Sequence, residues 1–255
     1  MSSSIDKSYA SIKAEFRQSG VCHVKEYFSP EQVKELADES KNLWESHSKQ
    51  GFNNLRIGLR NNLGGDPVMD RIDPVADISS IFGALNKDES LVNMVETLLE
   101  EPALVLKEKL IYKSPGTRGF GLHRDQPYYQ SAGVPGNEIL SVVIAIDDIG
   151  SHSGPIAFYP QLRFKKTQAP IGEPRDVEIS ETDGTDPLIF EIHSGDMLIF
   201  DGLIPHRSSA NRSTHSRRTY TITYIPARYE DGRSIYYANR FKEQKVERRH
   251  LIEDQ

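Results

Sequence analysis

The chain has 255 residues and a formal net charge of −6, with 37% hydrophobic and 27% charged residues. This composition is ordinary for a soluble protein, and the negative charge offers no broad basic surface for nucleic acid. No apolar run approaches the roughly 20 residues that a membrane-spanning helix needs, and residues 1–10 lack the apolar core of a signal peptide. We therefore expect a cytoplasmic protein without a nucleic-acid or membrane partner.

The chain is long enough to bury a sizeable core, and β sandwiches and barrels often reach this length as one domain. We find no internal repeat and no clear domain linker, so a single domain over residues 1–255 is expected. The single cysteine, Cys22, cannot form an internal disulfide, and a small buried thiol is its simplest interpretation. Nothing in the sequence indicates the oligomeric state.

Two helices are predicted in the first part of the chain. Residues 29–47 open with a capping serine, a proline at the first helical position and a glutamate, before apolar residues recur at helical intervals. Residues 89–100 form the second helix, which is expected to stop before Pro102. The faces expected to be buried contain Val33, Leu36, Leu43 and Trp44 in the first helix, and Leu91, Val92, Val95, Leu98 and Leu99 in the second.

After Pro102 the sequence favours short β-strands separated by turn residues. Helices followed by many short strands indicate an α+β fold, with a jelly-roll pair of sheets at its centre. We place the helical N-terminal part at about residues 1–102 and the jelly-roll core at about residues 103–240. The expected strands cover residues 103–113, 138–147, 154–159, 187–193, 196–201 and 220–227.

Two further segments are predicted to be loops. Residues 169–186 are polar and indicate an insertion or a lid. Arg56, Arg60 and Arg71 lie in a segment rich in Gly, Asn and Asp, which predicts a loop that covers the site. We expect these arginine side chains to be mostly solvated.

A His-x-Asp motif at His123 and Asp125 is the first candidate for metal binding. Side chains alternate between the two faces of an extended segment, so both ligands point the same way while Arg124 points to the other face. One metal ion can therefore be held from one strand. The motif also occurs by chance, so by itself it is weak support for a metal site.

The third ligand must come from another part of the chain. His206 follows a turn, a strand and a second turn, an arrangement that presents its side chain at a strand end. Two histidines and one carboxylate that bind one face of Fe(II) leave the other positions open for a co-substrate and dioxygen. Five other histidines are alternative candidates for the third ligand, but we expect them to be surface or hydrogen-bonded residues. They are His23, His47, His152, His193 and His215.

The residues near His206 favour it as the third ligand. Ser208 shares a face with His206, and Arg217 opens what should be the next strand. A guanidinium and a hydroxyl beside iron can hold a distal carboxylate, because the planar fork of arginine suits two-point contact. This grouping predicts a binding site for 2-oxoglutarate. The neighbouring Arg218 would face the opposite way, so a register slip is the main alternative.

Together these motifs resemble the phytanoyl-CoA dioxygenase family of Fe(II)/2-oxoglutarate-dependent oxygenases. The resemblance rests on His123-x-Asp125, on Gly195-Asp-x-x-x-Phe-Asp, and on His206-x-Ser-x-x-Asn-x-x-x-x-x-Arg217. It extends over most of the chain, since residues 20–24 and 109–116 are similar to the opening and to the strand and turn before the first ligand. One departure is Pro160-Gln-Leu-Arg, where the family commonly has a Pro-Gly-Ser-His turn.

The resemblance implies a double-stranded β-helix core, with His123, Asp125 and His206 on iron and Arg217 with Ser208 on the far carboxylate of 2-oxoglutarate. It also implies a dioxygenase that uses dioxygen, releases succinate and carbon dioxide, and by default hydroxylates an unactivated carbon. Desaturation, ring formation and epoxidation remain open. Related halogenases have a small residue in place of the carboxylate, so the aspartate argues against halogenation.

The sequence says less about the substrate. Tyr128 and Tyr129 follow the metal strand and are candidates for the wall of the substrate pocket, or for packing at the sheet edge. Lys107 and Lys109 share one face of an otherwise apolar strand, and an inward lysine could meet a carboxylate or phosphate. We expect Lys109 to be a second contact of 2-oxoglutarate.

Three alternatives to a small-metabolite oxygenase of specialised metabolism are retained. An acyl-CoA 2-hydroxylase of the same family would need a basic surface for the CoA phosphates, which the sequence does not show. A non-catalytic jelly-roll binding protein would not need all three ligands. A zinc hydrolase would leave Arg217 unexplained and has no obvious general base.

Overall fold

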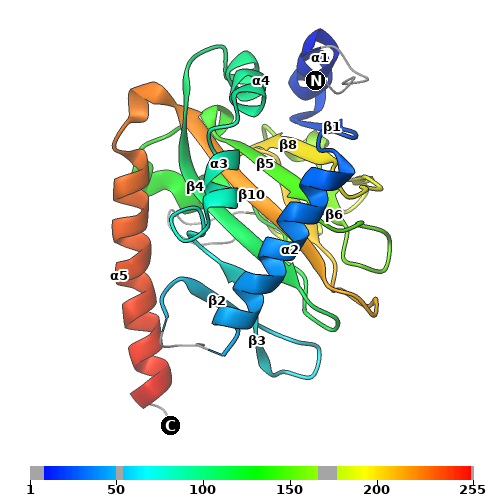
Figure 1. The fold of residues 1–255 in the computed structure, drawn as a ribbon. Helices are drawn as coiled ribbons and strands as arrows, with labels where there is room; N and C mark the ends of the chain where they lie inside the picture. The colour runs from blue at the N-terminus through cyan, green and yellow to red at the C-terminus, as the bar shows by residue number, and fades with distance from the viewer. Residues whose placement is uncertain (1–8, 50–53, 166–176, 254–255) are drawn as a thin grey trace.

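The computed structural model describes residues 9–49, 54–165 and 177–253 (Figure 1). The helices are α1 (Tyr9–Ser19), α2 (Pro30–His47), α3 (Ser80–Leu85), α4 (Glu89–Leu99) and α5 (Gly232–Glu253). The strands are β1 (Val21–Val24), β2 (Ile57–Asn61), β3 (Pro67–Ile72), β4 (Ala103–Lys113), β5 (Leu140–Ala145), β6 (Ile156–Phe158), β7 (Leu188–Ile189), β8 (Met197–Asp201), β9 (His206–Ser208) and β10 (Arg217–Pro226).

These strands form two antiparallel sheets. The larger sheet has seven strands in the order β1-β8-β5-β10-β4-β3-β2, and the smaller has three in the order β7-β6-β9. The long strands β4 and β10 pair over most of their length at the centre of the larger sheet. The predicted α+β class, with an antiparallel sheet pair and N-terminal helices packed on it, is confirmed.

Helices cover one face of the larger sheet, where α2 and α3 lie in front of the strands (Figure 1) and α4 packs as well. Alternate residues of β10 point toward these helices because side chains alternate along a strand. Tyr220 packs against Phe82 of α3, with ring centroids 4.7 Å apart. The buried cluster on this face also includes Leu36 and Leu43 of α2, Leu91, Met94 and Val95 of α4, and Ile222 and Tyr224 of β10.

The other face of the larger sheet turns toward the small sheet. Val143 of β5 and Phe200 of β8 pack there against Phe158 of β6. The remaining residues of β10 face the same space, and they are polar and buried: Arg217, Thr219, Thr221 and Thr223. The space between the sheets is therefore apolar at one side and polar along β10, which is where the candidate site lies.

The two predicted helices form close to the expected limits, with two local differences. The N-cap of α2 is Ser29, but the side chain that completes the capping box belongs to Gln32 and not to the preceding glutamate. α4 ends at Leu99, and its C-cap Glu100 adopts a left-handed conformation with φ of 63°. The helix therefore stops one residue before the predicted limit.

The segment predicted as a loop around Arg60 and Arg71 instead forms the hairpin β2–β3. Its strands were not evident because Gly, Asn and Asp lower β propensity, whereas Ile57, Met69 and Ile72 are buried by tertiary packing. Together with β1, this hairpin places three strands of the larger sheet before residue 103, so that part of the chain is not only helical.

Helix α5 was not predicted, because its sequence shows no clear apolar period. It runs along one side of the molecule (Figure 1) and packs on Tyr129 and Leu106 through Tyr236 and Tyr237. Among the described residues, no helix is both long and apolar enough to cross a membrane. Of the predicted loop 169–186, residues 169–176 lie outside the described residues, and the rest contains a 3-10 helix (Ile179–Thr182).

Candidate metal centre

The two histidines proposed as ligands are joined through their backbones. His123 N donates to His206 O at 3.0 Å, and His206 N donates to His123 O at 2.9 Å. This isolated antiparallel bridge brings a segment that follows β4 against the start of β9. The two imidazole rings consequently lie side by side, with centroids 4.3 Å apart.

Asp125 completes the group. Its Oδ1 lies 3.8 Å from Nε2 of His123 and 3.9 Å from Nε2 of His206. Two ligand bonds of about 2.1 Å to one divalent ion can span at most ~4.2 Å, so one ion can contact all three atoms after small side-chain adjustments. Within the described part of the chain, no other group of three His, Cys, Asp or Glu side chains has this arrangement.

The hydrogen bonds of the imidazoles fix their orientation. Nδ1 of His123 lies 2.7 Å from the carbonyl oxygen of Gly121, and Nδ1 of His206 lies 3.1 Å from that of Ile204. A proton on each Nδ1 satisfies these bonds and leaves the Nε2 lone pairs directed at the ion position. Burial and the neighbouring His206 lower the pKa of His123 to about 3, so its imidazole is neutral as metal binding requires.

A hydroxyl that sequence reasoning missed orients the carboxylate. Ser141 Oγ of β5 donates to Asp125 Oδ2 at 2.8 Å, which leaves Oδ1 facing the histidines. Burial acts to raise the pKa of Asp125, but the histidines, Lys109 and the hydrogen bond from Ser141 together lower it, so the group is ionised. The available signal was a lone serine in the otherwise apolar strand Leu140–Ala145.

Arg124 points away from the metal position, as alternation along the segment predicts. Its Nε donates to Leu203 O and its NH2 donates to Leu162 O, both at 2.7 Å. These bonds tie the ligand segment to the loop before β9 and to the 3-10 helix after β6 (Pro160–Leu162). The competing histidines His152, His193 and His215 are exposed, whereas His23 pairs with Asp196 at 2.8 Å.

A small cavity of about 70 Å³ extends from the metal position along β10. Asp125 and both histidines line one end, and Arg217 and Ser208 line it as well. Arg217 is 3% exposed, its NH2 donates to Gly154 O at 2.8 Å, and its Nε has no hydrogen-bond partner. Within the described residues no carboxylate lies within 4.0 Å of this guanidinium, so the cavity contains a buried cation without a counter-ion.

Ser208 and Lys113 lie beside Arg217. Lys113 Nζ donates to Ser208 Oγ at 2.8 Å and to Ser209 O at 2.7 Å, and Phe120 N donates to the same hydroxyl at 3.1 Å. Burial and the neighbouring Arg217 lower the pKa of Lys113 to about 6, while burial lowers that of Arg217 to about 10. Arg217 therefore keeps its charge at neutral pH.

The predicted register of β10 holds. Arg218 faces the helices, where its Nε and NH2 bind Asp147 at 2.8 and 2.7 Å and its NH1 donates to Ala37 O at 2.8 Å. Arg217 thus faces the cavity and Arg218 does not.

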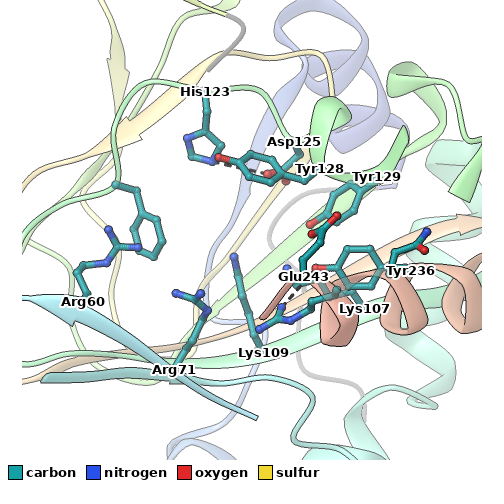
Figure 2. A pocket seen from close by; sticks show the side chains of 13 residues that line it. Arg60, Arg71, Lys107, Lys109, His123, Asp125, Tyr128, Tyr129, Tyr236 and Glu243 are labelled. Atoms are coloured by element: carbon teal, nitrogen blue, oxygen red, sulfur yellow. Dashed lines mark hydrogen bonds and ion pairs between the residues drawn. The ribbon is translucent and has the colours of Figure 1, made fainter. Parts of the chain in front are cut away.

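A larger cavity of about 350 Å³ adjoins the metal position (Figure 2). The two candidate tyrosines line it: Tyr128 is 44% exposed and has its ring centroid 5.6 Å from that of His123, whereas Tyr129 is 3% exposed. Both lie on a 3-10 helix, η2 (Gln126–Ala132). Lys109 lines this cavity and the smaller one, so it lies between them.

Several residues of this cavity were missed or misplaced from the sequence. Arg60 and Arg71 were expected in solvent, but they project into the cavity from β2 and β3 (Figure 2). Helix α5 contributes the other wall through Tyr236, Arg240 and Glu243. Neither contribution could be foreseen, because both depend on elements that the sequence pattern did not reveal.

Two lysines of β4 are charged: Lys107 is buried and Lys109 is half-buried. Burial lowers the pKa of Lys107 to about 8, although nearby Asp73 acts in the opposite direction. Burial and Lys107 lower the pKa of Lys109 to about 8. Both ammonium groups are therefore mainly protonated at neutral pH.

Among named relatives, a 2-aminoethylphosphonate dioxygenase from uncultured bacterium HF130_AEPn_1 is 25% identical over 230 residues, which cover 89% of this chain and 86% of that protein. A methylphosphonate hydroxylase from Gimesia maris is 31% identical over 144 residues, which cover 56% of this chain and 53% of that protein. The second similarity therefore spans about half of each chain.

Solved structures of similar fold include EctD from S. alaskensis with 2-oxoglutarate and 5-hydroxyectoine, with a TM-score of 0.75 and 20% identity over 90% of this chain and 79% of that one. The epimerase SnoN in complex with Fe3+, α-ketoglutarate and nogalamycin RO has a TM-score of 0.73 and 18% identity over 86% and 84% of the two chains. These similarities confirm the jelly-roll core.

The sequence model described as phytanoyl-CoA dioxygenase matches residues 16–219. This match covers most of the chain and agrees with the His-Asp-His group, so the protein belongs to the phytanoyl-CoA dioxygenase family of iron- and 2-oxoglutarate-dependent dioxygenases.

Proposed function

We propose that this dioxygenase hydroxylates an unactivated C–H bond of a small-molecule metabolite, with release of succinate and carbon dioxide. The observation that carries the proposal is one cavity with the His123, Asp125 and His206 group at one end and the buried, unpaired Nε of Arg217 in its wall. We assign the three ligands to Fe(II). Two histidines and a carboxylate on one face are the ligand set of such iron oxygenases.

The chemistry of the donors fits 2-oxoglutarate. A buried guanidinium without a carboxylate partner is costly, and a bound carboxylate that accepts from it removes that cost. Arg217 and Ser208 are assigned to the distal carboxylate, and Lys113 supports Ser208 through its 2.8 Å hydrogen bond. Lys109 is assigned as the second contact, because it lies between this cavity and the larger one.

Iron with 2-oxoglutarate and dioxygen supplies the oxidation, in which one oxygen atom enters the substrate C–H bond and the other enters succinate. The protein orients the substrate and excludes water. Tyr128 covers the metal position from one side through its edge contact with His123. Tyr129 is buried against Tyr236 of α5, with ring centroids 5.5 Å apart, and lines the same cavity.

A small substrate fits better than an acyl-CoA. The cationic side chains gather inside the cavity beside the metal position, whereas the phosphates of CoA are many bonds from the oxidised carbon of an acyl chain. The two named relatives are a 2-aminoethylphosphonate dioxygenase and a methylphosphonate hydroxylase, which makes small phosphonates the first compounds to test.

The proposal is tested by adding Fe(II) and 2-oxoglutarate to metal-free protein without oxygen. We expect the weak visible charge-transfer band of a keto acid chelated to iron, and we expect the His123→Ala variant to lack it. On admission of oxygen with a substrate, succinate and hydroxylated product should form in equal amounts. Protein that binds iron but shows no band would contradict the function.

The hydroxyl of Ser141 offers a milder prediction. Ser141→Ala removes the 2.8 Å bond that orients Asp125, and loss of such a supporting contact typically costs about 10- to 100-fold in metal affinity or activity. Fe(II) affinity measured under anaerobic conditions should fall within that range, while the affinity for 2-oxoglutarate at saturating iron changes little. Val142→Ala, at the next position but facing the helices, is the control.

A further inference from the structure

The larger cavity beside the metal position has a strongly basic lining. Five cationic side chains line it: Arg60, Arg71, Lys107, Lys109 and Arg240. Figure 2 shows Arg60, Arg71 and Lys109 projecting from the strands on the side opposite His123 and Asp125. The cavity volume of about 350 Å³ lies in the range of small-molecule sites.

Among the described residues, the carboxylates around this cavity do not balance these cations. Asp70 is shared by Arg60 at 2.8 Å and Arg71 at 3.0 Å. Asp73 is shared by Lys107 at 3.4 Å and Arg240.

Within the described residues, Lys109 has no carboxylate within 4.0 Å, and Asp125 is directed at the metal position. Even after Glu243 of α5 is included, the lining keeps an excess of positive charge. Uncompensated cations in a concave, partly buried site favour an anionic ligand.

A glycine in β2 makes space for the side chain of one of these cations, Arg71. Gly58 of β2 pairs with Arg71 of β3, and a Cβ at Gly58 would lie 2.5 Å from Cγ of Arg71. The missing side chain allows Arg71 to lie across β2 toward the cavity. Arg60 stacks on the ring of Phe120, with its guanidinium carbon 3.7 Å from the ring centroid. Phe120 lines both cavities.

We propose that this cavity binds the dianionic, tetrahedral phosphorus head group of a small substrate, a phosphonate or a phosphate monoester, through Arg71, Arg60 and Lys109. The inference rests on the proposed function, because it places the carbon chain of that substrate next to His123 and Asp125. A dianion matches the excess charge, and guanidinium groups suit the several acceptor oxygens of a PO3 group. Glu243 on α5 also lines the cavity, and its carboxylate can accept a hydrogen bond from a primary ammonium group of the substrate.

The test uses protein loaded anaerobically with Fe(II) and 2-oxoglutarate, and calorimetric titration with four compounds of matched skeleton. These are 2-aminoethylphosphonate, O-phosphoethanolamine, taurine and β-alanine. We expect at least one phosphorus compound to bind at least about tenfold more tightly than taurine or β-alanine, since they differ mainly in head-group charge. The comparison of the first two separates a phosphonate from a phosphate ester.

Equal or tighter binding of taurine or β-alanine, or no binding of either phosphorus compound, overturns the inference. The visible keto-acid band, recorded on the same sample, reports separately on the proposed function. A band without phosphonate binding leaves the oxygenase intact and removes only the substrate class. A sample without the band removes the function itself.

Variants assign the binding to this cavity. Arg71→Met leaves Asp70 with its bond from Arg60, so the fold should persist, and the affinity for the preferred phosphorus compound should fall at least about tenfold. Lys25→Met removes the same charge from an exposed position after β1, at the opposite edge of the sheet from β2, and should change nothing. Arg60→Met is a second variant at a residue that lines only the larger cavity, and it leaves Asp70 with its bond from Arg71.

The affinity of Arg71→Met for 2-oxoglutarate, titrated by the visible band, should match wild type because Arg71 does not line the smaller cavity. Unchanged phosphonate binding in both Arg71→Met and Arg60→Met would show that the head group binds elsewhere.

Discussion

His206→Ala is expected to weaken Fe(II) binding by more than about 100-fold and to abolish turnover. Loss of a group that only supports a ligand costs about 10- to 100-fold in metal affinity, and loss of the ligand itself should cost more. The measurement is an anaerobic equilibrium titration with Fe(II), followed by the visible band after 2-oxoglutarate is added. His206 also packs at 4.7 Å from the ring centroid of Phe200, so thermal unfolding must show that the variant is folded.

The matched control is His152→Ala, which removes an exposed histidine whose backbone oxygen, but not its ring, accepts a bond from Arg212 N. Its iron affinity should equal that of wild type. If His206→Ala instead titrates as wild type does while remaining folded, the third ligand has been assigned wrongly. The exposed His193 and His215 would then be the next to replace.

Arg217→Met should raise the dissociation constant of 2-oxoglutarate at least about 30-fold, because truncating one partner of a buried charge pair costs roughly 2–5 kcal/mol. The side chain is 3% exposed, so water replaces little of the lost interaction. Iron affinity should change much less, since Arg217 is not one of the three proposed iron ligands. Titration of the visible band with 2-oxoglutarate at saturating iron gives the co-substrate constant, and anaerobic titration with Fe(II) gives the iron constant.

Arg218→Met is the control for this prediction. This variant also removes one guanidinium group, but from the opposite face of β10, where Arg218 binds Asp147. Because that ion pair is partly exposed, its loss should cost stability of at most about 1 kcal/mol and leave 2-oxoglutarate affinity unchanged. The reverse pattern, with Arg218→Met weakening the co-substrate and Arg217→Met not, would place the carboxylate site on the wrong side of the sheet.

Local alternation explains why much of the candidate site could be predicted. In an extended segment, the two-residue period alone directs His123 and Asp125 to one face and Arg124 to the other, and the structure has this arrangement. The same period separates Arg217 from Arg218. Period and turn residues also predicted the central strand Ala103–Lys113 with its observed limits, because its pattern is long and uninterrupted.

Long-range packing decided the rest. The proximity of His206 to His123 depends on an isolated bridge between segments more than 80 residues apart, which no local pattern contains. Ser141 contacts Asp125 because β5 lies beside β8 in the larger sheet, and the turn after β8 binds the segment of Asp125 through the bond from Gln126 N to Gly202 O.

The basic cavity is likewise a tertiary feature. The hairpin β2–β3 forms from a segment of low β propensity because the sheet and helices bury Ile57 and Ile72. Helix α5 docks through Arg240 to Asp73 and Arg233 to Glu108, contacts between residues distant in sequence. By itself the sequence therefore determined the ligand types and the faces of their strands, since these follow from local geometry. Only the tertiary structure assembled the charged wall that faces the metal position, because its five cations come from four separate elements.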